Sequence, residues 1–116
     1  MISSLAHAVL VSGLDDWVPL LATDGIARQL GVSTDEKIRR DRIVDAVEEL
    51  VGAGLVEIGT VTAAGFNLWS GQPHEWVSRI RREVEENSGS YWEFAWWTNN
   101  TALGDVIAGH STVICD

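Results

Sequence analysis

Histidines, a lone cysteine and paired carboxylates are the side chains of this 116-residue chain that could carry chemistry. The histidines are His7, His74 and His110, and Cys115 is the single cysteine. A zinc site needs ligands at short, regular spacings, and these four residues show none. His74 is followed by glutamate as in the HExxH zinc motif, but position 78 is serine, so the second ligand is missing. We therefore expect no metal site.

The acidic pairs and the glycines do not form catalytic or cofactor motifs either. Asp15-Asp16 and Glu48-Glu49 are sequence neighbours, and adjacent side chains of a helix or loop point apart, which makes them poor acid/base partners. Gly52 and Gly54 follow a predicted helix and precede a strand, the reverse of the order in a phosphate-binding loop. We expect a non-catalytic protein without a cofactor.

A group of basic residues at the start of a predicted helix is the first candidate binding site. Its members are Lys37, Arg39, Arg40 and Arg42, preceded by Thr34. Each base has an acid three or four residues away, such as Asp35 before Arg39 and Glu36 before Arg40, a spacing at which helical side chains form ion pairs. The bases at 79–82 show the same pattern. Because phosphate binding gains its strength from uncompensated cations, such paired bases are expected to bind DNA weakly.

The second candidate is an aromatic run near the C-terminus, residues 91–97. If it forms a strand, alternate side chains share a face. Trp92, Phe94 and Trp96 then lie on one face, and Tyr91, Glu93 and Trp97 lie on the other. Two interpretations stay open: the first set fills the core while Trp97 covers a loop, or the second set forms a contact surface for a partner protein or a second copy of the chain.

Three helices around a short extended segment are predicted for the first half of the chain. Apolar residues at helical spacing begin at Ile2, and this helix ends near Gly13. Residues 17–21 contain a proline and are predicted to be an extended connection or an edge strand. The second helix is expected to be capped by Thr23 or Asp24, with Gly31 taking the left-handed conformation at its end.

The third helix is predicted to begin at a capping box, Ser33 to Glu36, and to stop at Gly52. Its apolar stripe starts only at Ile43. We therefore expect the first two turns, residues 35–42, to project from the core and to be exposed.

A hairpin, a helix and an aromatic strand or arm are predicted for the second half. Residues 55–61 and 66–69 are rich in β-branched and aromatic side chains and are joined by a glycine-containing turn, which predicts the hairpin. Pro73 suits the first turn of a fourth helix, and a short final helix follows a cap within residues 98–101. The buried stripe of the fourth helix is expected to comprise Trp76, Val77, Ile80 and Val84.

Two junctions in this order of elements resemble those of winged helix-turn-helix regulators. Ala27 to Ser33 reads A-x-x-L-G-V-S and resembles their helix-turn junction. Leu50 to Val56 resembles the junction between recognition helix and wing. The resemblance implies an α+β, winged helix-like single domain over residues 1–116, with three N-terminal helices and the hairpin as wing. It also implies that the third helix enters the DNA major groove and presents the candidate side chains Thr34, Lys37, Arg39, Arg40 and Arg42.

The charge balance favours a different partner. Seventeen acids and eight bases give a formal net charge of −9, which favours basic proteins and disfavours phosphate backbones and anionic membranes. The single cysteine and the absence of a long apolar segment indicate a cytoplasmic protein. We expect a small acidic protein-binding module of the immunity, antitoxin or inhibitor type that docks a basic partner. The alternative is a DNA-binding regulator that dimerises through its first helix or its aromatic arm.

Overall fold

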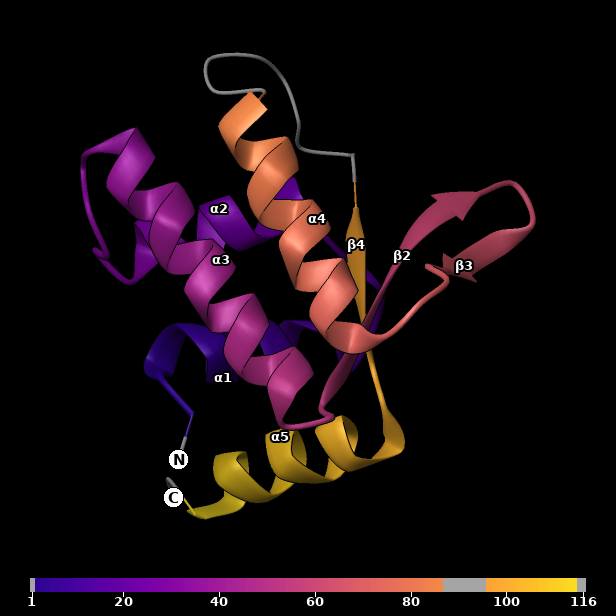
Figure 1. The fold of residues 1–116 in the computed structure, drawn as a ribbon. Coiled ribbons are helices and arrows are strands. Elements are labelled where there is room, and N and C mark those ends of the chain that lie inside the picture. The colour runs from indigo at the N-terminus through magenta and orange to yellow at the C-terminus, as the bar shows by residue number, and fades with distance from the viewer. Residues whose placement is uncertain (1, 87–95, 115–116) are drawn as a thin grey trace.

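A computed structural model describes the backbone of residues 2–86 and 96–114, and the side chains of these residues except 20, 21, 86 and 110–114. Within this part the chain forms an α+β structure with five helices and one four-stranded antiparallel sheet (Figure 1). The helices pack mainly against one another and against one face of the sheet, and the predicted α+β class is confirmed.

Helix α1, Ser4–Ser12, forms as predicted. The Ser3 hydroxyl caps it by accepting a hydrogen bond of 3.2 Å from the Ala6 amide. Its apolar face, which includes Val9 and Leu10, is buried in the core. The helix ends at Gly13, where the sequence predicted the end.

The boundary between strand β1 and helix α2 differs from the prediction. Strand β1, Val18–Pro19, is an edge strand of only two residues, and α2, Leu20–Gln29, begins directly after it. Pro19 stands at the cap position in an extended conformation and makes no side-chain cap hydrogen bond. The predicted cap at Thr23 or Asp24 is therefore wrong, because both residues lie inside α2. Gly31, with φ of 67°, adopts the predicted left-handed conformation.

Helix α3, Glu36–Gly52, begins two residues later than a helix capped by Ser33 would begin. Asp35 is the cap, and its Oδ1 accepts a hydrogen bond of 3.1 Å from the Ile38 amide. Ser33 instead accepts a hydrogen bond from the Asp35 amide and stabilises the turn before the helix. The predicted stripe is confirmed: Ile43, Ala46, Val47, Leu50 and Val51 are all buried.

The sheet consists of β1, β2 (Val56–Thr62), β3 (Gly65–Leu68) and β4 (Trp97–Asn100) in the order β1-β4-β2-β3. The β2–β3 hairpin is confirmed. Of the predicted aromatic strand, residues 91–95 lie outside the described residues, and Trp97 is the first residue of β4. Within β4, β-branched Thr98 is fully buried and is paired with Val18 and Ile58 of the neighbouring strands.

Helices α4, Pro73–Glu86, and α5, Ala102–Ile114, complete the fold. Helix α4 packs beside α3, and its predicted residues Trp76, Val77 and Ile80 are buried while Val84 is partly buried. Helix α5 lies below α1 in Figure 1 and packs against it, and the Thr101 hydroxyl caps α5 by accepting a hydrogen bond from the Gly104 amide. No helix in the described part of the chain is long and apolar enough to cross a membrane.

Candidate docking face

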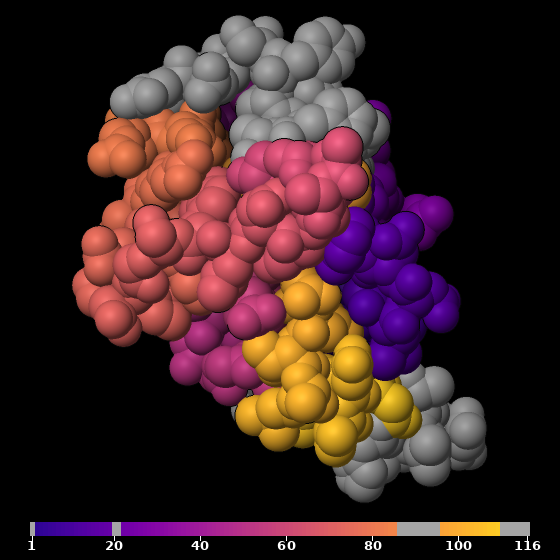
Figure 2. Space-filling model, turned by 90° about the vertical axis from the view of Figure 1, so that its right-hand side faces the viewer, coloured from indigo at the N-terminus to yellow at the C-terminus, as the bar shows by residue number. Residues whose placement is uncertain are grey.

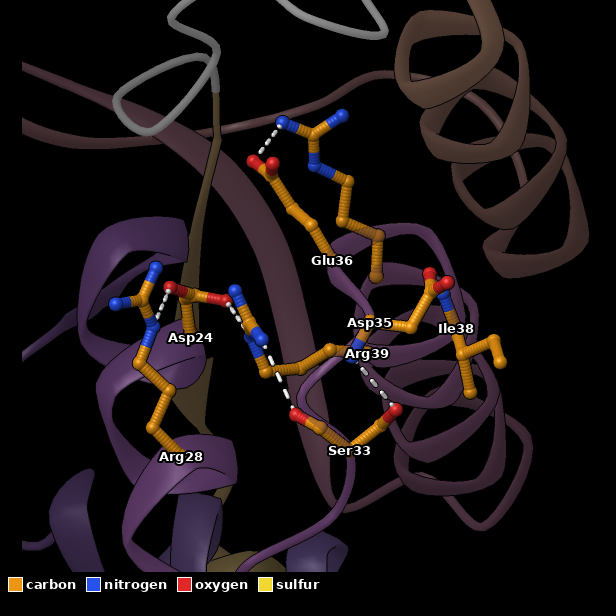
Figure 3. Close-up of polar contacts among 8 residues, drawn as sticks. Asp24, Arg28, Ser33, Asp35, Glu36, Ile38 and Arg39 are labelled. Carbon is orange, nitrogen blue, oxygen red and sulfur yellow. Dashed lines mark hydrogen bonds and ion pairs between the residues drawn. The ribbon is translucent and has the colours of Figure 1, made fainter.

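Arg39 was predicted to project from the core, but it is only 5% exposed. Its Nε donates a hydrogen bond of 2.7 Å to Asp24 Oδ1 of α2, and its Nη1 donates to the Ser33 carbonyl at 3.1 Å (Figure 3). The predicted partner Asp35 instead caps the helix. Through these two contacts Arg39 joins the first turn of α3 to α2 and to the turn between the two helices.

Arg40 is also buried, with 8% exposed, so the expectation of two exposed turns is wrong for both arginines. Its predicted ion pair with Glu36 is confirmed. The remaining DNA-binding candidates, Thr34, Lys37 and Arg42, are exposed. Neither Lys37 nor Arg42 has a carboxylate at ion-pair distance among the described residues.

Other basic residues also form ion pairs with acids of the same chain. Arg28 pairs with Asp24 at 2.9 Å, and Arg79 pairs with Glu83 at 3.3 Å while its guanidinium lies 3.7 Å from the centre of the Trp69 ring. With Arg39, Arg40 and Arg81, five of the chain's eight bases form ion pairs with described acids. The acids outnumber the bases, so many carboxylates remain at the surface without such a pair.

Arg81 joins α4 to α3. Its Nη2 lies 3.1 Å from Asp45 Oδ1 and 2.9 Å from Glu48 Oε1, whereas the sequence predicted a partner on its own helix. Burial lowers the pKa of Arg81, but the hydrogen bonds and charges of the two carboxylates outweigh this effect and leave the pKa raised. The guanidinium therefore stays charged at neutral pH.

The face of the sheet opposite the helices carries large apolar side chains. Strand pairing places Pro19, Trp97, Gly59 and Leu68 in one row across all four strands, and successive residues point to opposite faces. The neighbouring row, which includes Thr98 and Ile58, is buried against the helices. Trp97 is half-buried and Leu68 is 52% exposed, so the row that contains them forms an outer face.

Trp17 and Phe66 extend this face. Their ring centres lie 6.0 Å apart, and both side chains are half-buried. The Phe66 ring lies over Gly59, where an added Cβ would meet the ring at 2.7 Å and collide with the Asn67 carbonyl. A side chain at position 59 would therefore displace the aromatic ring. The aromatic face is defined here as Trp17, Phe66, Leu68 and Trp97.

A hollow of about 320 Å³ adjoins the aromatic face. It lies where the loop before β1 meets the start of α5, and it is lined by Gly13, Leu14, Asp15, Asp16, Trp17, Asn99, Asn100 and Asp105. Figure 2 shows this loop, the hairpin and the β4–α5 junction side by side at the surface. Trp17 belongs to both features, so the three carboxylates of the hollow, Asp15, Asp16 and Asp105, share its lining with one side chain of the aromatic face. We call this feature the acidic hollow.

The structure brings one of the three predicted interface residues into this face. Trp97 belongs to it, whereas Tyr91 and Glu93 lie outside the described residues. Sequence reasoning missed Trp17, Phe66 and Leu68. Alternation within the predicted strand indicated that Phe66 and Leu68 lie on the same face of the sheet. Only the order of the strands places this face in the same row as Trp97.

Comparison with models of known protein families, with curated proteins and with solved structures finds no match for this chain. Among the described residues, no group of three or more His, Cys, Asp or Glu side chains could hold a metal ion.

Proposed function

We propose that this protein is a non-catalytic binding module whose aromatic face docks a basic protein. The observation that carries the proposal is the position of the half-buried and exposed apolar side chains beside three carboxylates on one face. Aromatic side chains at the centre of a contact supply much of the binding energy of protein interfaces. The carboxylates of the acidic hollow favour a partner with positive charge at this face.

The distribution of ion pairs supports a basic partner. Five of the eight bases form ion pairs with acids of the same chain. The net charge of −9 therefore comes mainly from surface carboxylates without such a partner. Complementary charge accelerates encounter and rejects acidic competitors, while the apolar contact slows dissociation. Immunity proteins, antitoxins and small inhibitors of basic proteins use this combination, and the protein is proposed to act in that manner in the cytoplasm.

Selection from a displayed random-peptide library tests the proposal. Peptides that combine Lys or Arg with apolar residues should be recovered, and their affinity should fall as ionic strength rises. Leu68→Glu and the double change Asp15→Asn, Asp16→Asn should each weaken binding of the selected peptides about tenfold or more. Asp41→Asn, an exposed acid of α3 outside this face, is the matched control. Recovery of acidic peptides, or equal binding by all variants, would refute the proposal.

A DNA-binding regulator is the second candidate function. Two observations favour it: the order α1-β1-α2-α3-β2-β3 along the chain is the one that a winged helix would have, and Thr34, Lys37 and Arg42 are exposed near the start of α3. Two features weigh against it: β4 lies between β1 and β2, and two of the four candidate bases are buried. Fluorescence anisotropy of labelled duplex DNA at about 50 mM salt tests it. Binding that Lys37→Gln and Arg42→Gln abolish would support the regulator.

A further inference from the structure

We propose that a cleft between α3 and α4 binds a small amphipathic anion, such as a carboxylate with an aromatic or aliphatic body. The cleft has a volume of about 470 Å³, within the range of small-molecule sites. Its lining residues are Lys37, Arg40, Asp41 and Val44 of α3 and Arg81, Val84 and Glu85 of α4. It is separate from the aromatic face, and the proposal does not depend on the proposed function.

The arrangement of the two helices forms the cleft. Helices α3 and α4 lie side by side and run in opposite directions, and they draw apart toward the start of α3 and the end of α4 (Figure 1). Arg81 joins them through Asp45 and Glu48. The lining residues come from the diverging halves, so the cleft opens above this connection.

The lining combines apolar side chains with positively charged ones. Val44 is buried and Val84 is partly buried, and both can contact the apolar body of a ligand. Arg40 and Arg81 are held in place by ion pairs with Glu36 and with the acids of α3. These acids largely compensate the charge of both arginines, so the two side chains form fixed polar walls of the cleft and leave the anionic group to a cation without such a partner.

Lys37 is the cation best able to bind the anionic group. It is exposed at the edge of the cleft and has no carboxylate at ion-pair distance among the described residues. Its ammonium group carries three hydrogen-bond donors on a flexible chain. Asp41 and Glu85 also line the cleft, so a ligand with a single anionic group placed at Lys37 fits better than a polyanion.

Titration with 8-anilinonaphthalene-1-sulfonate tests the inference, because this amphipathic anion fluoresces when it enters an apolar site. Lys37→Met should weaken its affinity about tenfold, since a charge-assisted hydrogen bond is lost. Arg42→Met is the matched control: Arg42 is an exposed base of the same helix that does not line the cleft, and its removal should leave the affinity unchanged. Octanoate should compete with the probe.

Amide chemical shifts locate the probe. Shifts confined to residues 37–44 and 81–85 are expected, and both variants should keep the wild-type circular dichroism spectrum because both residues are exposed. Equal affinity in wild type and Lys37→Met, equal weakening by the control, or shifts on the hairpin at residues 57–68 would overturn the inference. The last result would place the probe on the aromatic face and would leave the docking proposal intact.

Discussion

Arg39 Nε lies 2.7 Å from Asp24 Oδ1, so the first turn of α3 is bound to the middle of α2 by a covered ion pair. The Arg39 side chain is 6% exposed and the Asp24 side chain 18%. The same carboxylate binds the exposed Arg28 through its second oxygen. One acid thus organises the α2–α3 junction, and it removes Arg39 from the surface on which a DNA-reading side chain would have to lie.

Asp24→Asn should destabilise the fold by about 2–4 kcal/mol, because the buried Arg39 guanidinium would lose its counter-charge. The substitution keeps the side-chain size, so the loss reports charge rather than packing. Urea unfolding followed by circular dichroism measures the change. Asp41→Asn, which removes an exposed acid without a described ion pair, should cost less than about 0.5 kcal/mol. An equal loss of unfolding free energy in the two variants would show that the ion pair between Asp24 and Arg39 does not stabilise the fold more than an exposed acid does.

Arg81→Met should have a much smaller effect, less than about 1 kcal/mol, because Arg81 and its two acids are each about half exposed. The raised pKa of folded Arg81 means that its contribution is fully present below the usual arginine pKa and is lost only as pH rises through the folded value. The stability difference between wild type and variant should therefore be constant from about pH 6 to 9. A difference that grows across this range would contradict the assignment.

Gly104→Ala should destabilise the protein by about 1–3 kcal/mol, since its Cβ would collide with the Leu55 carbonyl and force α5 away from the chain before β2. Gly109 provides a control on the same helix, because an added Cβ there meets no atom within 4 Å. Gly109→Ala should stabilise by up to about 1 kcal/mol through helix propensity. Thermal unfolding of both variants measures the contrast, and changes of the same sign would show that α5 packs differently.

Two tryptophans should respond differently to truncation. Trp96 is fully buried, so Trp96→Ala should cost about 3–5 kcal/mol. Trp17 is half-buried on the aromatic face, and Trp17→Ala should cost about 1–2 kcal/mol. Denaturant unfolding of each variant gives the values. A loss at Trp17 as large as that at Trp96 would make the aromatic face part of the core rather than a docking surface.

Local pattern was enough to predict most elements of this chain. The spacing of Ile43, Val47 and Leu50 marks the buried stripe of α3, and the turn before Phe66 marks the hairpin. These signals are local because helix and strand periods are properties of successive residues. The cap of α3 was misplaced by two residues, since Ser33 and Asp35 offer competing oxygen acceptors within one turn.

The candidate sites depend on contacts between segments far apart in the sequence. By itself, the sequence determined the helices, the hairpin, the acidic charge and the pairing of Arg40 with Glu36, because each depends on neighbours within about one helical turn. Only the tertiary structure decided that Arg39 pairs with Asp24 and that β4 enters the sheet between β1 and β2. Strand order and burial are set by how the whole chain packs its apolar surface, and one sequence pattern is compatible with several such packings.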